Sequence, residues 1–204
     1  TGVVEREKNA YPVKLQQMLG DKYEVGNFGK PGATLLNKGH RPYTQQQEYK
    51  DALAFAGDIV VIHLGINDTD PRNWPNYRDE FIGDYRSLMQ SFREVNPKVR
   101  FLLARMTPLS DRHYRFESGT RDWHAEIQLA IECIAKAEGV QLIGETFNVT
   151  GTCSGNNAGF ALDKVFDKNI VFRFDDIGSS FVAVFVLDIF KVFLNNRNEL
   201  RFVS

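Results

Sequence analysis

A regular alternation between helical and strand-like periodicity constrains the fold of this 204-residue chain more than any other feature. Apolar residues recur at helical spacing in four segments, and short apolar runs typical of buried strands lie between them. The expected helices are residues 11–19, 45–56, 81–92 and 123–134, and the expected strands are residues 23–28, 58–64, 99–106 and 140–143. This order predicts an α/β fold, with a parallel sheet between layers of helices.

The order of elements has one irregularity, which is that it begins with a helix. Doubly wound domains usually open with a central strand, and the sequence before residue 11 has no strand-like run. We therefore expect a parallel sheet from which the first strand is missing.

Two predicted strands end in segments that suit a ligand site. The run Val60 to Leu64 ends in Gly-Ile-Asn67-Asp, and the strand 23–28 is followed by a glycine-rich turn that contains Gly32. Each segment is also a plain turn sequence. However, the carboxyl ends of parallel strands are where open α/β sheets bind their ligands. The side-chain amide of Asn67 and the backbone N–H of Gly32 would together form an oxyanion hole there.

Composition and motifs exclude several classes of function. The net charge of −1 gives no overall field for binding nucleic acid or an anionic membrane, and no apolar run has the length of a membrane span. The two cysteines, Cys133 and Cys153, do not have metal-ligand spacing. The chain contains neither Gly-x-Gly-x-x-Gly nor a Walker-type loop, so no nucleotide cofactor is expected, and no metal.

The segments NFGKPGATLL and VVIHLGINDTDP resemble motif blocks of the SGNH (GDSL) serine hydrolases. With AYPVKLQQML and RFESGTRDWHAEI, they are closest to bacterial carbohydrate acetylesterases, including those that act on acetylated sialic acids. The resemblance covers about residues 1–145. It implies a three-layer, flavodoxin-like domain that hydrolyses esters through a serine, with Gly32 and Asn67 stabilising the oxyanion.

The chain departs from this family pattern at the nucleophile and at the base. The family's serine block would lie just upstream of Thr1, so its serine is absent from the sequence. The segment after Phe174 fits the outline of the family's Asp-x-x-His block, with Asp175 at the acid position but Gly178 in place of histidine. A serine without a general base is a poor nucleophile near neutral pH. We therefore expect the chain as given to have little or no esterase activity.

A basic loop and a nearby aromatic residue are the expected substrate contacts. His40 and Arg41 lie in the loop Lys-Gly-His-Arg, and Trp74 follows the Asn67 motif. Aromatic faces and guanidinium groups suit sugars and acidic groups. The expected partner is a small-molecule or glycan ester, and the oligomeric state stays open. The alternative function is a catalytically silent carbohydrate-binding protein derived from the same fold.

Residues 146–204 admit two interpretations. Their sequence resembles the start of a discoidin-like carbohydrate-binding β-sandwich, but it also fits a degenerate C-terminal part of the 1–145 domain. These 59 residues are too few for a complete sandwich, which usually needs about seven strands. The localisation stays open, with a secreted or periplasmic bacterial protein as one expectation.

Overall fold

The computed structural model of the chain describes residue 8 and residues 10–107, 121–144 and 201–203. Within this part, helices and strands alternate in the predicted order. The longer helices are α2 (Tyr11–Leu19), α3 (Gln47–Phe55), α5 (Phe81–Val95) and α6 (Arg121–Glu138). The strands are β1 (Glu24–Gly26), β2 (Ile59–Ile62), β3 (Arg100–Ala104), β4 (Gln141–Ile143) and β5 (Arg201–Val203). Short helical turns are η1 (Gly20–Lys22), η2 (Tyr43–Gln45), η3 (Ile66–Thr69), α4 (Trp74–Tyr77) and η4 (Arg78–Glu80).

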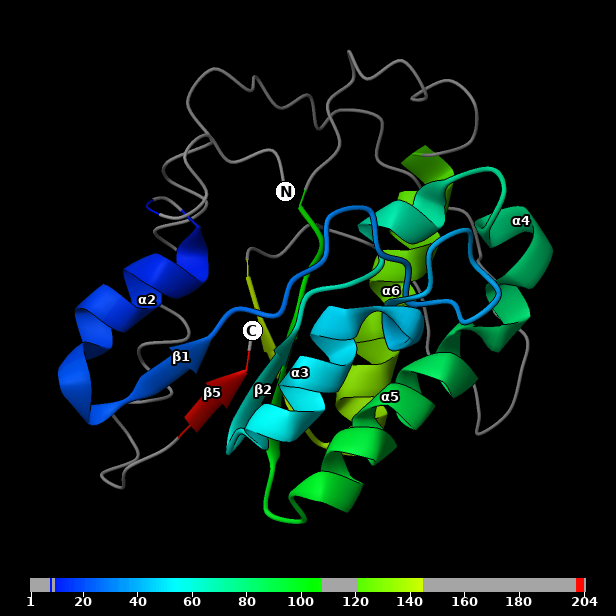
Figure 1. The fold of residues 1–204 in the computed structure, drawn as a ribbon. Coiled ribbons are helices and arrows are strands. Elements are labelled where there is room, and N and C mark those ends of the chain that lie inside the picture. Colours follow the sequence, from blue (N-terminus) through cyan, green and yellow to red (C-terminus); the bar gives the residue numbers. More distant parts are fainter. Residues whose placement is uncertain (1–7, 9, 108–120, 145–200, 204) are drawn as a thin grey trace.

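The five described strands form one parallel sheet in the order β1-β5-β2-β3-β4 (Figure 1). The predicted α/β architecture is therefore confirmed. Strand β5, which comes from the far end of the described residues, lies between β1 and β2 in this sheet. Val203 of β5 pairs with Gly26 on one side and with Val60 on the other.

The two faces of the sheet carry separate apolar clusters, because successive side chains of a strand point to opposite faces. Ile59 and Val61 of β2 pack on one face with Leu15 of α2. Val60 and Ile62 pack on the other face, which is covered by α3, α5 and α6 (Figure 1). All four residues of β2 are buried, as expected for an inner strand of a parallel sheet.

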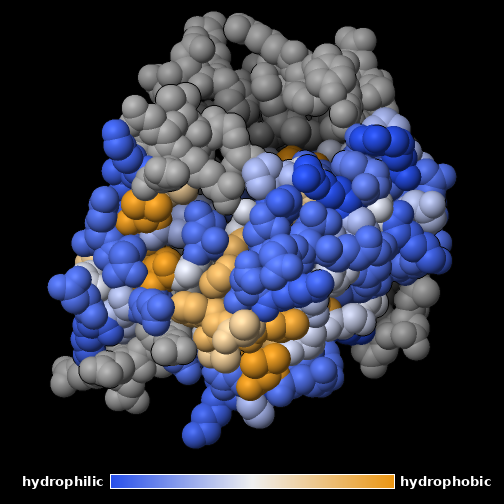
Figure 2. All heavy atoms as spheres, in the orientation of Figure 1, coloured by the Kyte–Doolittle hydropathy of each residue, from blue (hydrophilic) through white to orange (hydrophobic). Residues whose placement is uncertain are grey.

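Helix α5 shows how the sequence pattern fixes this layer. Its buried residues recur at intervals of three and four, as in an amphipathic helix, and all lie within the predicted range 81–92: Phe81, Tyr85, Leu88, Met89 and Phe92. The opposite face of the helix is polar. Figure 2 accordingly shows a mostly hydrophilic outer surface over α3 and α5, with an apolar patch on the side of α3 that faces β1. The layer leaves the carboxyl ends of the strands to the connecting loops.

Candidate active site

Two loops meet at the carboxyl ends of β1 and β2. We call residues 27–42, which follow β1, the Gly32 loop, and residues 65–69, which follow β2, the Asn67 turn. The Asn67 turn begins at Gly65, whose φ of 121° is unfavourable for other residues. A Cβ atom on Gly65 would also lie 2.9 Å from the sulfur of Met106. The motif therefore needs glycine here so that the chain can leave β2 and form the tight turn η3.

Asp68 joins the two loops. Its carboxylate accepts hydrogen bonds from the backbone N–H groups of Leu35 and Leu36, each at 2.9 Å, and the residue is fully buried. Burial raises the pKa of Asp68 to about 7, while the two N–H donors favour the charged form and oppose the shift. The sequence interpretation gave Asp68 only a turn role. The available signal was a carboxylate in the turn that follows a buried strand.

Asn67 reaches the same loop through its side chain. Its amide Nδ2 donates to the carbonyl of Ala33 at 2.9 Å, which brings the amide to within one residue of Gly32. An amide NH₂ has two hydrogens, so one remains for a ligand. Gly32 itself has a φ of 77°, and its backbone N–H has no acceptor among the described residues. The two donors proposed from the sequence are therefore neighbours in the structure.

Asn73 is a second buried connector that the sequence did not reveal. Its Oδ1 accepts from the backbone N–H of His40 at 2.9 Å, and its Nδ2 donates to the carbonyl of Asn67 at 2.9 Å. These two backbone contacts fix the orientation of the amide, because each requires a different end of it. The Nδ2 also lies 2.9 Å from Nδ1 of the His40 ring. Asn73 thus ties the basic loop to the Asn67 turn.

The three expected substrate contacts have different surroundings. His40 and Arg41 are exposed on the Gly32 loop. Trp74, by contrast, is only 2% exposed, packs edge-on against Phe81 at 5.3 Å, and donates its indole N–H to Glu126 at 2.6 Å. This placement corrects the expectation for Trp74, because its indole is a core group joining α4 to α6. His40 and Arg41 thus lie together at the surface, whereas the indole of Trp74 points into the core.

The remaining expected catalytic groups are not among the residues described. Asp175 and Gly178 lie outside them. The described serines are Ser87 and Ser91, both on α5, and the hydroxyl of Ser91 donates to its own helix at Leu88. Within the described part, the site at the Gly32 loop and the Asn67 turn therefore consists of oxyanion-type donors and their supports.

The described histidines other than His40 are occupied elsewhere. Burial lowers the pKa of His63, at the end of β2, to about 4, and a backbone hydrogen bond with Arg105 opposes this shift. His63 is half-buried, and its ring lies beside that of Tyr11, with 6.5 Å between the two ring centroids. His124 lies 2.8 Å from the carbonyl of Thr107 through Nε2, and burial lowers its pKa as well.

The described residues contain no group of three or more His, Cys, Asp or Glu side chains arranged to hold a metal ion. Among the helices in the described ranges, none is long and apolar enough to cross a membrane.

Comparison with known proteins identifies the class. The model of the GDSL-like lipase/acylhydrolase family matches residues 2–165. The chain belongs to this family. It is also similar to an acetylxylan esterase of Xylanibacter ruminicola, with 48% identity over 92 residues, which are 45% of this chain and 19% of that protein. The chain thus spans about a fifth of that relative's length. No solved structure matches.

Proposed function

We propose that this domain belongs to a serine esterase that removes acetyl groups from a carbohydrate, and that Gly32 and Asn67 are its oxyanion donors. The observation that carries the proposal is the hydrogen bond from Asn67 Nδ2 to the carbonyl of Ala33, directly beside Gly32. Family membership supports ester hydrolysis, and the similarity to an acetylxylan esterase supports an acetylated glycan as substrate.

The chemistry follows from the two donors. When a nucleophile attacks an ester carbonyl, the oxygen gains negative charge in the tetrahedral intermediate. Donors that are already fixed in place stabilise this charge more than they stabilise the neutral carbonyl, so they lower the barrier. The free hydrogen of Asn67 and the N–H of Gly32 would donate to that oxygen. The serine is proposed to lie upstream of Thr1, and Asp175 to be the acid of the triad.

The alternative is a catalytically silent carbohydrate-binding protein. The observation in its favour is that the described serines, Ser87 and Ser91, both lie on α5 rather than at the strand ends. His40 and Arg41 would contact the sugar in either case.

The test is hydrolysis of 4-nitrophenyl acetate and of acetylated xylo-oligosaccharides by this chain and by a longer polypeptide that continues upstream of Thr1. Asn67→Ala in the active form is expected to lower kcat by about a hundredfold to a thousandfold. Asn76→Ala is the matched control, because the Asn76 amide is exposed and bonds only to Pro71 and Arg72 backbone carbonyls.

The outcomes separate the two functions. Activity that survives Asn67→Ala would reject the oxyanion assignment. If both polypeptides are folded and inactive but bind acetylated sugar in a calorimeter, the silent binding protein is the correct reading.

A further inference from the structure

The Gly32 loop and the Asn67 turn are surrounded by cations, most of which are paired. Lys30 contacts Glu48 at 2.7 Å, and Lys38 contacts Glu80 at 2.7 Å. Arg72 is held by Asp70 in the same way, at 2.9 Å. Each of these cations already has a carboxylate, so none is set up to bind another.

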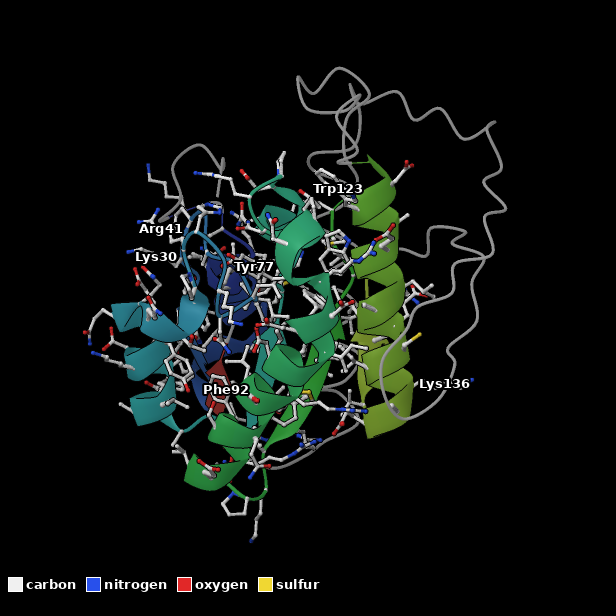
Figure 3. The ribbon with its side chains drawn as sticks, turned by 90° about the vertical axis from the view of Figure 1, so that its right-hand side faces the viewer. Lys30, Arg41, Tyr77, Phe92, Trp123 and Lys136 are labelled. Carbon is white, nitrogen blue, oxygen red and sulfur yellow. The ribbon has the colours of Figure 1, made fainter. Side chains whose placement is uncertain are left out.

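Arg41 differs from these neighbours in its contacts. The Glu48 carboxylate, whose pKa is lowered chiefly by its hydrogen bond to Lys30 and also by the charge of Arg41, is the nearby acid, and it is already bound to Lys30. No carboxylate of the described residues lies within 4.0 Å of the Arg41 guanidinium, and the hydrogen bond it makes there runs from Nη1 to the carbonyl of Pro31 at 3.2 Å. A guanidinium has five N–H donors, so most of them remain for a ligand. Figure 3 shows Arg41 and Lys30 at the same outer edge of the molecule.

The position of Arg41 is tied to the proposed oxyanion donor. A Cβ atom built on Gly32 would lie 3.5 Å from Nη1 and 3.8 Å from Cδ of Arg41, so the guanidinium lies against Gly32. The backbone of Arg41 is also fixed, because its carbonyl accepts from Thr34 N–H at 2.8 Å and Pro42 forms a parallel bridge with Thr34. The guanidinium therefore lies beside Gly32, on a segment of backbone that is fixed.

We propose that Arg41 forms an anion subsite next to the oxyanion donors, and that the substrate is an acylated sugar carrying a carboxylate, of the uronic acid type. This inference rests on the proposed function and adds the substrate class to it. A planar guanidinium binds a carboxylate through two parallel hydrogen bonds, which a neutral sugar cannot provide. The carboxylate would lie on the acylated sugar or on the sugar next to it.

The test measures binding with a matched pair of ligands that an esterase cannot cleave. The ligands are the methyl glycosides of N-acetylglucosamine and of N-acetylglucosaminuronic acid, which differ only in a hydroxymethyl against a carboxylate. In calorimetry at pH 7 and low salt, the acid is expected to bind about tenfold more tightly, because a charge-assisted pair of hydrogen bonds is stronger than a neutral one. Raising the ionic strength should reduce this ratio.

Three variants assign the preference to Arg41. Arg41→Gln should abolish the preference for the acid over the neutral sugar. Arg41→Lys should keep only part of it, since an ammonium lacks the planar pair of donors. Lys38→Gln is the matched control: Lys38 lies on the same loop but is paired with Glu80, so this change should leave the ratio unaltered.

The inference is overturned if the wild-type protein binds both sugars equally, if it binds neither, or if Arg41→Gln keeps the preference for the acid. The proposed function fails separately, if the polypeptide that continues upstream of Thr1 hydrolyses neither 4-nitrophenyl acetate nor acetylated xylo-oligosaccharides. A protein that prefers the acid but hydrolyses no ester would retain the anion subsite and lose the esterase assignment.

Discussion

The Gly32 loop is held to the domain by two carboxylates that use the same chemistry in different surroundings. Asp68 accepts two backbone N–H groups at 2.9 Å and is fully buried. Asp84 of α5 accepts the backbone N–H and the side-chain amide of Asn37, both at 2.8 Å, and is only half-buried. The two contacts have similar lengths, so their geometry alone would rank them as equals.

The two carboxylates differ in whether water can replace them as hydrogen-bond acceptors. If the Asp84 contact is lost, water reaches Asn37 and satisfies its donors, so the cost is small. If Asp68 is lost, the N–H groups of Leu35 and Leu36 are left without a partner in a dry site, which is far more costly. The backbone at Leu35 and Leu36 is thus the part of the loop that depends on a buried carboxylate.

The largest expected effect is the pH dependence that comes from Asp68. Its folded-state pKa of about 7 lies above the ordinary 3.8, so between these values the folded protein keeps a proton that the unfolded chain has released. This contribution to stability is complete below pH 4, falls as the pH rises and levels off above pH 7. The change is on the order of 4 kcal/mol.

Urea unfolding of the wild type and of Asp68→Asn across pH 4 to 8 measures this contribution. The asparagine variant cannot ionise at this position, so the difference between the two curves isolates Asp68 from the other titrating groups. If the free energy of unfolding changes with pH equally in the two proteins, the pKa of Asp68 has no such shift.

The next largest change in stability is expected when the Asp68 carboxylate is removed altogether. At pH 5, Asp68→Ala should lower the free energy of unfolding by about 3 kcal/mol, because two buried N–H groups lose their acceptor. Urea unfolding gives the value, and hydrogen exchange should show faster exchange at the amides of Leu35 and Leu36. Unchanged protection of these two amides would mean that the loop is held by other contacts.

Asn73 is a third residue that holds the Gly32 loop, and its removal is expected to have an intermediate effect on stability. Asn73→Ala should cost about 2 kcal/mol, since the carbonyl of Asn67 and the backbone N–H of His40 both lose a buried partner. Thermal unfolding at neutral pH measures the loss. Asn76→Ala, which removes an exposed amide from α4, should leave the midpoint nearly unchanged. Equal losses in the two variants would contradict the role given to Asn73.

The smallest effect completes the comparison of the two carboxylates. Asp84→Ala should cost only about 1 kcal/mol, because solvent can reach the donors of Asn37. Measured in the same urea titration as Asp68→Ala, it is expected to give the smaller of the two losses. If Asp84→Ala proves the more damaging, the burial argument is wrong.

The sequence was sufficient to predict the four longer helices, the strands β1 to β4 and the meeting of the two loops. The spacing of apolar residues located α5 and its buried face, and the rule that parallel strands end at one edge brought the segments of Gly32 and Asn67 together. Both inferences depend on local periodicity or on sheet direction, which single sequences record well.

The supports of the site could not be predicted in the same way. Asp68 contacts residues more than 30 positions earlier, and the burial of Trp74 depends on Glu126, 52 positions later. Trp74 stands among polar residues and prolines, so its sequence surroundings indicate exposure. Partners so distant in sequence leave no periodic pattern around either residue. Strand β5 has only three residues, and so short a run cannot be recognised from the sequence as an inner strand of the sheet.

The place of β5 in the sheet has a consequence for how the protein is made. Within the described residues β1 pairs only with β5, and β5 in turn pairs with β2. The sheet between β1 and β2 is therefore not complete until residues 201–203 are available. During synthesis, β2, β3 and β4 emerge from the ribosome well before that segment. Until then β1 and the facing edge of β2 lack the partner that they have among the described strands, and open strand edges favour pairing with other chains.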